Sequence, residues 1–228
     1  MSCFVFCDFS KAFDKVWHRG LLHKLKAYGI NGNLFDWFHS YLNEREQRVV
    51  IKDASSSFTT ILGGVPQGSV HGPLLFIIYI NDIADKLTSL TRLFADDTSF
   101  NCSHSDGTEM QSIINHDLKE LDEWSERWLM TFNPDKTDIM LFTNLEHPEI
   151  NFTFEDNIIS TIESHRHLGV TFSTDAKWND HIENIVSSVS KHIHILRKLI
   201  FKINRSNLEK TLFSLHKANI RIRFRSLG

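Results

Sequence analysis

Phe94-Ala95-Asp96-Asp97 places two adjacent carboxylates within residues 93–100, where short apolar stretches flank them and predict a tight β-hairpin with Asp96-Asp97 as its turn. A third carboxylate, Asp8, ends the apolar strand predicted over residues 3–7. Two divalent ions about 3.5–4 Å apart can clamp the attacking and leaving oxygens of a displacement at phosphorus. Such hard cations take oxygen ligands. The three aspartates therefore predict a two-metal site for nucleotidyl transfer.

Further motifs surround this pair in a fixed order along the chain. They are Asp8-Phe9-Ser10-Lys11-Ala12-Phe13-Asp14, then Gly64-Val65-Pro66-Gln67-Gly68-Ser69, and, after the aspartate pair, Asn133-Pro134-Asp135-Lys136-Thr137 and His167-Leu168-Gly169-Val170. The string resembles the palm of reverse transcriptases, and most of all those of non-LTR (LINE-type, jockey-like) retrotransposons. The resemblance covers about residues 3–205. An isolated Asp-Asp is weak evidence, but five motifs in this order are strong evidence.

The resemblance implies RNA-directed DNA synthesis, in which a primer 3′-hydroxyl attacks the α-phosphorus of a dNTP. Asp8, Asp96 and Asp97 would hold two Mg²⁺ ions, with Mn²⁺ able to substitute, and Asp96 would be a direct ligand. Lys136 would lie near the leaving pyrophosphate, where a cation neutralises charge or acts as a general acid. The implied partners are an RNA template, a DNA primer and dNTPs, with no membrane.

The resemblance also assigns the residues that contact substrate. Phe13, five positions after Asp8, would pack beneath the incoming sugar and clash with a 2′-hydroxyl. The residues expected to contact the nucleotide and template are Gly64, Pro66, Gln67, Gly68 and Ser69, and those expected to form the primer grip are Leu168, Gly169 and Val170. His71 and His167 depart from the pattern, because the family usually carries an apolar and an aromatic residue there. Asp14 is expected to be structural.

Each of these residues also has a structural interpretation, which the sequence alone leaves open. Asp8 could cap a helix, Phe13 could be a core residue, the glycine-rich loop could be a simple turn, and Lys136 could be a solvated turn lysine. Ca²⁺ binding at the aspartate pair is disfavoured because the spaced acidic ligands of an EF-hand are missing. Zinc binding at the His-x-His pairs is disfavoured because no cysteine or helical carboxylate accompanies them.

Composition places few limits on the class of protein. The chain has 228 residues, 41% hydrophobic and 23% charged, which suits a globular protein with a sizeable core. Its three cysteines are an odd number without paired spacing, which argues against a disulfide framework. Apolar runs are too short to span a bilayer, and the N-terminus predicts a strand rather than a signal peptide. The expected location is intracellular, with the nucleus expected for retrotransposition although no targeting signal is evident.

Charge is distributed unevenly along the chain. Residues 191–228 contain ten Lys or Arg and one acid, a net +9, so residues 1–190 carry −12 of the total −3. A basic C-terminal segment suits contact with a phosphate backbone, although a solvated helix face is the simpler interpretation.

The expected fold class is α+β: an antiparallel palm sheet backed by helices, with a partial helical thumb. The expected domains are residues 1–174 and 175–228. Hydrophobic periodicity predicts helices at 15–28, 34–42, 74–83 (with Pro73 at its first position), 110–128 and 178–203. It predicts strands at 139–142, 150–154 and 168–172, and a pair of strands at 47–51 and 58–61 around a polar turn at 53–57.

The fingers region and the endonuclease of such elements are expected to be missing from this chain. Three hypotheses follow from the sequence. They are a reverse transcriptase palm and thumb, a catalytically inactive remnant that at most binds nucleic acid, and another palm-fold phosphotransferase such as a nucleotide cyclase. The Gly64–Ser69 loop and the basic segment 191–228 argue against the third.

Overall fold

The centre of the fold is a four-stranded sheet with the strand order β6-β7-β1-β8. These strands are β1 (Ser2–Asp8), β6 (Leu90–Phe94), β7 (Asp97–Ser103) and β8 (Asp138–Phe142). β7 pairs antiparallel with both β1 and β6. The computed structural model describes residues 1–143, 150–154, 157–199, 204, 207 and 210. The expected α+β class with antiparallel sheets is confirmed.

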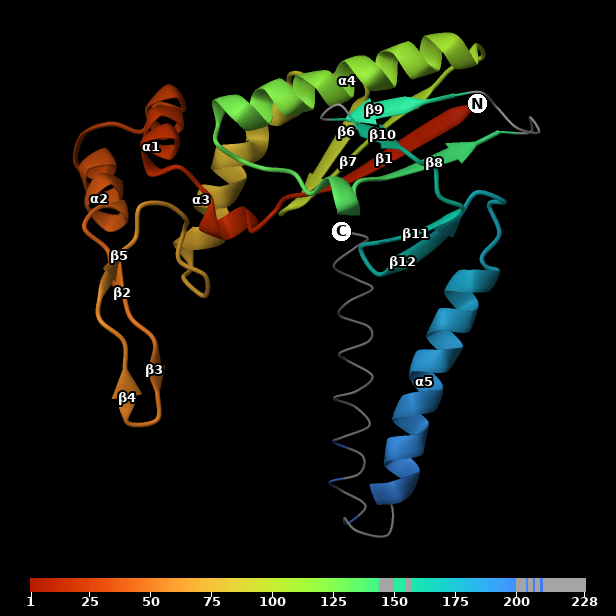
Figure 1. The fold of residues 1–228 in the computed structure, drawn as a ribbon. Coiled ribbons are helices and arrows are strands. Elements are labelled where there is room, and N and C mark those ends of the chain that lie inside the picture. The colour runs from red at the N-terminus through yellow and green to blue at the C-terminus, as the bar shows by residue number, and fades with distance from the viewer. Residues whose placement is uncertain (144–149, 155–156, 200–203, 205–206, 208–209, 211–228) are drawn as a thin grey trace. The chain divides into compact units, whose positions relative to one another are not determined.

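One face of β1 is buried because its side chains alternate across the pleat. Cys3, Val5 and Cys7 are at most 3% exposed. α4 (Gly107–Arg127) contacts β1 and β7 and runs along the sheet (Figure 1). The predicted helix at 110–128 is thus confirmed, with a start near that expected. It begins after Asp106, whose side chain accepts a hydrogen bond from the Thr108 N–H.

The core-facing side of α4 follows the helical period. Its buried apolar residues are Met110, Ile114, Leu118, Leu121 and Trp124. The helix also packs on β9 (Phe152–Phe154), which pairs antiparallel with β10 (Asn157–Ile159). Phe152 and Phe154 are almost fully buried.

Three helices lie between β1 and β6 in the sequence. They are α1 (His18–Ala27), α2 (Gly32–Leu42) and α3 (His71–Ile80), and α1 contacts both of the others. Short 3₁₀ turns flank them: η1 (Ala12–Asp14) precedes α1, and η2 (Asn81–Ile83) follows α3.

Two predicted helix starts are wrong. α1 begins at His18 rather than Lys15, because Lys11 adopts a left-handed conformation (φ 54°) and residues 12–14 form a separate turn. α3 begins at His71, so Pro73 is its third residue rather than its first. Proline is tolerated there because the first-turn N–H groups lack helical partners.

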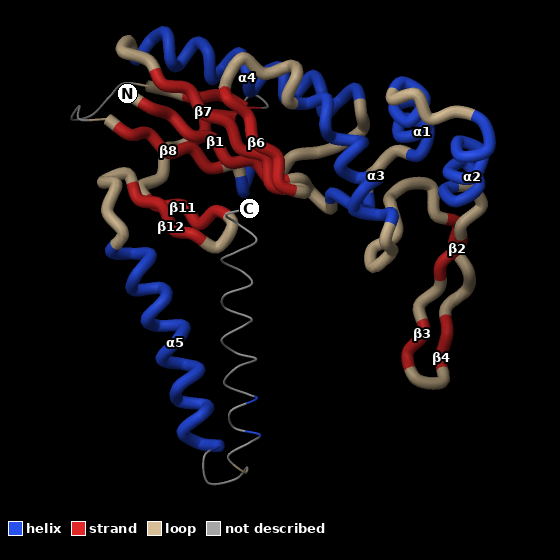
Figure 2. Tube along the Cα trace, turned by 180° about the vertical axis from the view of Figure 1, so that it is seen from behind, coloured by secondary structure: helices blue, strands red, loops and turns tan. Residues whose placement is uncertain are grey.

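A narrow two-stranded ribbon lies between α2 and α3 in the sequence. It consists of β2 (Glu46–Gln47) paired with β5 (Thr59–Thr60), and β3 (Val50–Ile51) paired with β4 (Ala54–Ser55). Figure 2 shows it extending from the α1–α2–α3 group. The predicted strand pairing is confirmed in outline, but the tip turn lies at Lys52-Asp53 rather than over residues 53–57.

The chain forms two compact units, one of residues 1–139 and 144–160, the other of 140–143 and 161–228. The second unit contains the hairpin of β11 (Ser164–His167) and β12 (Val170–Ser173), and then α5 (Asn179–Leu199), which contacts β12. The hairpin at 164–173 therefore groups with α5. The division into palm and thumb at residue 174 stays a prediction, and most of the basic segment 191–228 lies outside the described residues.

Candidate active site at the ends of β1 and β7

Asp8 and Asp97 lie directly opposite each other, at the last position of β1 and the first of β7. Met1 and His104 exchange both backbone hydrogen bonds at the other end of this pair of strands. Hydrogen-bonded and non-hydrogen-bonded pairs alternate along an antiparallel ladder. Seven steps on, Asp8–Asp97 is therefore a non-hydrogen-bonded pair, the kind in which side chains approach most closely. The sheet brings two of the three predicted carboxylates together.

Asp96 lies in the turn of the β6–β7 hairpin. Phe94 pairs with Asp97, which leaves Ala95 and Asp96 as the turn residues, with Ala95 at φ 52°. The predicted turn at Asp96-Asp97 is thus displaced by one residue. Asp97 belongs to the strand because it pairs with both Phe94 and Asp8. The shift separates the two neighbours: Asp97 faces Asp8 across the strands, and Asp96 occupies the loop tip.

Lys136 contacts the same strand end. Its Nζ donates a hydrogen bond to Asp8 Oδ2 at 2.7 Å. It ends the 3₁₀ turn η3 (Pro134–Lys136), and the Asn133 N–H donates to the Asp8 carbonyl at 2.9 Å. The hydrogen bond to Asp8 raises the pKa of Lys136, and the charge of Asp96 adds to this effect. Asp8, Asp97 and Lys136, which are distant in sequence, therefore meet at one end of the sheet.

The loop Gly64–Ser69 packs against the segment that follows β1. The Val65 N–H donates to the Phe13 carbonyl at 2.7 Å. The Phe13 ring is half-buried and stacks on Phe76 of α3 at a centroid distance of 4.6 Å. Ser69 Oγ donates to the Pro66 carbonyl and accepts from the Gly72 N–H, which fixes the loop to the start of α3.

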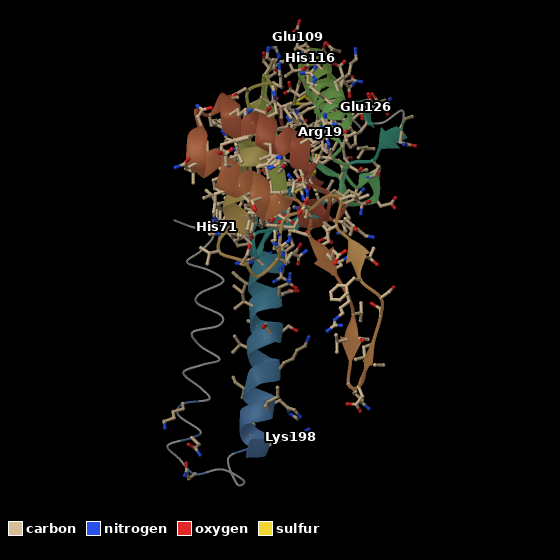
Figure 3. All side chains as sticks on the ribbon, turned by 90° about the vertical axis from the view of Figure 1, so that its left-hand side faces the viewer. Arg19, His71, Glu109, His116, Glu126 and Lys198 are labelled. Carbon is tan, nitrogen blue, oxygen red and sulfur yellow. The ribbon has the colours of Figure 1, made fainter. Side chains whose placement is uncertain are left out.

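His71, one of the two departures from the family pattern, is the first residue of α3 and is labelled in Figure 3. Its ring meets those of Trp37, Phe38 and Tyr41 of α2 edge-on, at centroid distances of 5.1, 6.5 and 5.9 Å. An imidazole presents an apolar edge and face to such neighbours. Histidine therefore takes the packing role that an apolar residue would have at this position.

The predicted primer-grip residues lie in the second unit. Leu168 (φ 49°) and Gly169 (φ 85°) are the two turn residues of the β11–β12 hairpin, and Val170 begins β12. Two consecutive positive φ angles are characteristic of the tight turn that suits a hairpin. The pKa of His167, the second departure, is lowered by burial and then by the neighbouring His165. The strand predicted at 168–172 therefore begins two residues later, at Val170, and the primer-grip role stays a prediction.

The donor set at the strand ends suits a hard divalent cation. Asp8, Asp96 and Asp97 offer carboxylate oxygens, and the contact of Lys136 with Asp8 shows that a positive charge is accommodated there. Over the part of the chain that the structure describes, no group of three or more His, Cys, Asp or Glu is close enough to form a preassembled cation cage.

Two further residues organise this region: sequence reasoning missed His18, and it named Asp14 only as a structural residue. His18, only 6% exposed, contacts the Gly64 carbonyl through Nε2 at 2.7 Å. Asp14 accepts a hydrogen bond from Gln67 Nε2 at 3.1 Å. The one available signal was their position within ten residues of Asp8.

Among the described residues, no helix has the length and apolar character to cross a membrane.

An antiparallel sheet that gathers aspartates at one end, with helices packed on it, is the architecture of a polymerase palm. Two telomerase structures from Candida tropicalis share the fold. One, in complex with a fragment of telomeric RNA, has a TM-score of 0.55 and 13% identity over 78% of this chain and 30% of that chain. The other, truncated from its C-terminal domain, has a TM-score of 0.52 over 76% of this chain and 34% of that chain.

The chain belongs to the reverse transcriptase (RNA-dependent DNA polymerase) family, whose model matches residues 1–172. It is 28% identical over 211 residues to the RNA-directed DNA polymerase from mobile element jockey of Drosophila melanogaster, covering 89% of this chain. It is 29% identical over 216 residues to the jockey polymerase of Drosophila funebris, covering 91% of this chain. The chain spans 23% of the length of these relatives. Enzymes of this family use divalent metal ions.

Proposed function

We propose that this chain carries out nucleotidyl transfer from a dNTP to a DNA primer on an RNA template. The observation that carries the proposal is the meeting of Asp8, Asp97 and Lys136 at one end of the sheet, with Asp96 in the adjacent turn. Family membership and the jockey relatives support the reaction class.

Asp8, Asp96 and Asp97 would hold two Mg²⁺ ions, for which Mn²⁺ can substitute. When bound, these ions stabilise the charge on the attacking and leaving oxygens. The chain supplies the carboxylates and holds two of them at fixed positions, because Asp8 and Asp97 are locked by strand pairing. Repulsion between neighbouring carboxylates favours cation binding at such a site.

Lys136 would act on the charge that leaves with pyrophosphate. The hydrogen bond to Asp8 raises the pKa of Lys136, so the side chain stays an ammonium that would neutralise this charge, and the same shift makes it a weaker proton donor. Removal of one preorganised electrostatic partner typically costs on the order of 10²-fold in rate. Lys136→Ala should therefore lower the rate of extension by about that factor.

Phe13 and the Gly64–Ser69 loop would contact the incoming nucleotide and the template. Phe13 has its ring fixed by stacking on Phe76, which gives it the rigidity that steric exclusion of a 2′-hydroxyl requires. The turn at Leu168-Gly169, followed by Val170, would hold the primer strand.

Primer extension on an RNA template with Mg²⁺ or Mn²⁺ tests the proposal. Asp8→Ala and Asp97→Ala should abolish extension, and Asp96→Asn should remove most of it. Asp36→Ala, which alters an exposed carboxylate on α2, should leave it intact. A chain that melts cooperatively but does not extend a primer would instead support an inactive remnant. Full activity in Asp96→Asn would show that the site assignment is wrong.

A further inference from the structure

Two chain segments distant in sequence are joined beside the site by backbone hydrogen bonds. In the Gly64–Ser69 loop, the Val65 N–H donates to the Phe13 carbonyl at 2.7 Å. The Gly64 N–H donates to the Val16 carbonyl at 2.8 Å. Both carbonyls belong to the segment that follows β1. The Gly64 carbonyl in turn accepts a hydrogen bond from His18 Nε2 at 2.7 Å. Since a carbonyl only accepts, this ring nitrogen carries the proton. The loop therefore has a fixed position on this segment.

Gly64 brings the loop backbone into direct contact with Asp14. A Cβ at Gly64 would lie 2.8 Å from the Asp14 carbonyl oxygen and 3.0 Å from its Cα, too close for any other residue. Gly64 also has φ 86°. Glycine here sets the spacing that lets a side chain of the loop reach Asp14.

That side chain is Gln67, whose Nε2 donates to Asp14 Oδ1 at 3.1 Å. A carboxylate has no proton to donate, so the amide nitrogen, not the amide oxygen, must face it. Both residues are exposed, and exposed pairs of this kind contribute little to stability. The contact thus fixes an orientation rather than the fold.

We propose that Asp14 is a positioning residue: it holds the Gln67 amide with Nε2 on the carboxylate, which leaves Oε1 as the acceptor presented to the nucleotide and template. The group recognised would be a hydrogen-bond donor, for which a template ribose 2′-hydroxyl and a guanine 2-amino group are the two sources in a template–primer duplex. This inference rests on the proposed function. It revises the expectation that Asp14 is merely structural.

Steady-state primer extension with the full chain tests the inference. Asp14→Ala should raise the KM for dNTP about threefold, the effect of about 0.7 kcal/mol of lost interaction at an exposed pair, with kcat unchanged. In a Gln67→Ala background, Asp14→Ala should have no further effect, because the two residues act as one unit. Asp36→Ala is the matched control. Equal KM values for Asp14→Ala and wild type, or a further loss in the Gln67→Ala background, would overturn the inference.

Two template changes identify the donor group. If the 2′-hydroxyl is recognised, a 2′-deoxy templating nucleotide should cancel the KM difference between wild type and Asp14→Ala. If the guanine 2-amino group is recognised, inosine in place of guanine should cancel it. A KM difference that survives both changes would overturn the acceptor role of Oε1.

A second measurement separates the failure of this inference from the failure of the proposed function. The side-chain NH₂ signals of Gln67 in a ¹⁵N NMR spectrum should shift in Asp14→Ala, whether or not the chain extends a primer. A wild-type chain without activity would count against the proposed function, while shifted Gln67 signals would still support the pairing. Identical Gln67 signals in wild type and Asp14→Ala would overturn the pairing even in an active enzyme.

Discussion

Asp8 faces Asp97 across the β1–β7 pair, although 88 residues separate them in sequence. Like charges directly opposite each other on antiparallel strands are destabilising, and a bound cation reverses that effect. The Asp8 carboxylate in this chain already has a hydrogen bond from Lys136. The strand end thus combines a carboxylate pair with one protein cation, and its stability should depend on what other cations are present.

Divalent ions should stabilise the fold through this pair. At ten times the dissociation constant, a ligand that binds only the folded state adds about 1.4 kcal/mol. We expect Mg²⁺ or Mn²⁺ to raise the Tm of the wild-type chain, and Asp8→Asn or Asp97→Asn to lose most of the increase. Thermal unfolding with and without the ion measures this. An equal increase in both variants and in Asp36→Asn would place cation binding elsewhere.

Lys136 should make stability depend on alkaline pH. Its pKa in the folded chain lies above the ordinary value of about 10.4, because the ammonium donates to Asp8. The folded state therefore holds this proton more tightly, so the stabilisation is complete below about pH 10.4 and is lost as pH rises through the folded pKa. We expect the stability difference between wild type and Lys136→Gln to shrink above that pH. A difference that stays constant up to pH 12 would contradict the contact.

Lys24 should produce the opposite dependence. It is 4% exposed, its Nζ bonds Asp82 Oδ1 at 2.5 Å, and it lies 3.6 Å from the Trp128 ring centroid. Burial lowers the pKa of Lys24 to about 8, against the opposing influence of Asp82. Between pH 8 and about 10.4 the unfolded chain binds this proton and the folded chain does not, so stability should rise with pH. Denaturant unfolding across this range should show the rise in wild type relative to Lys24→Met.

Asp82 should matter more to stability than its surface position suggests. It accepts hydrogen bonds from both Lys24 and the Trp124 indole. Asp82→Asn would leave a buried ammonium without its counter-charge, which we expect to cost about 3 kcal/mol. The matched variant Asp85→Asn, at a nearby exposed carboxylate, should change the free energy of unfolding by less than about 0.5 kcal/mol. Equal effects of the two substitutions would show that the ion pair contributes nothing.

The cysteines should differ in reactivity. Burial raises the pKa of both Cys3 and Cys7 to about 12, and these thiols are at most 3% exposed. Cys102 is partly exposed, and its pKa is also raised by burial. Because the thiolate is the nucleophile, we expect an alkylating reagent to label Cys102 slowly and the other two only after unfolding. Mass spectrometry of the labelled peptides checks the order, and rapid labelling of Cys3 in the folded chain would contradict it.

Local patterns predicted the elements whose own residues decide their conformation. The apolar run of β1 and the periodic stripe of α4 gave the correct element types, and α4 has a capping aspartate at its start. The starts of α1 and α3 were wrong because backbone conformation at Lys11 and packing of His71 on α2 decide them. Periodicity carries no information about either contact.

The site was predicted as a set of residues but not as an arrangement. Asp8, Asp97 and Lys136 were identified by type and order. The position of the hairpin turn at Ala95-Asp96, one residue before the predicted one, and the contact of Lys136 with Asp8 were not predicted. The pairing of Asp14 with Gln67 was also missed, because neither residue has an unusual neighbour in sequence.

The sequence by itself determined the order of the motifs, the types of the main elements and the residue types at the candidate site, since these depend on side-chain chemistry and local periodicity. Only the tertiary structure decided that Asp8 stands opposite Asp97, that Lys136 bonds Asp8 and that Lys24 is buried beside Asp82. Strand register and burial depend on how distant segments pack, and a shift of one residue would turn each side chain to the other face of the sheet.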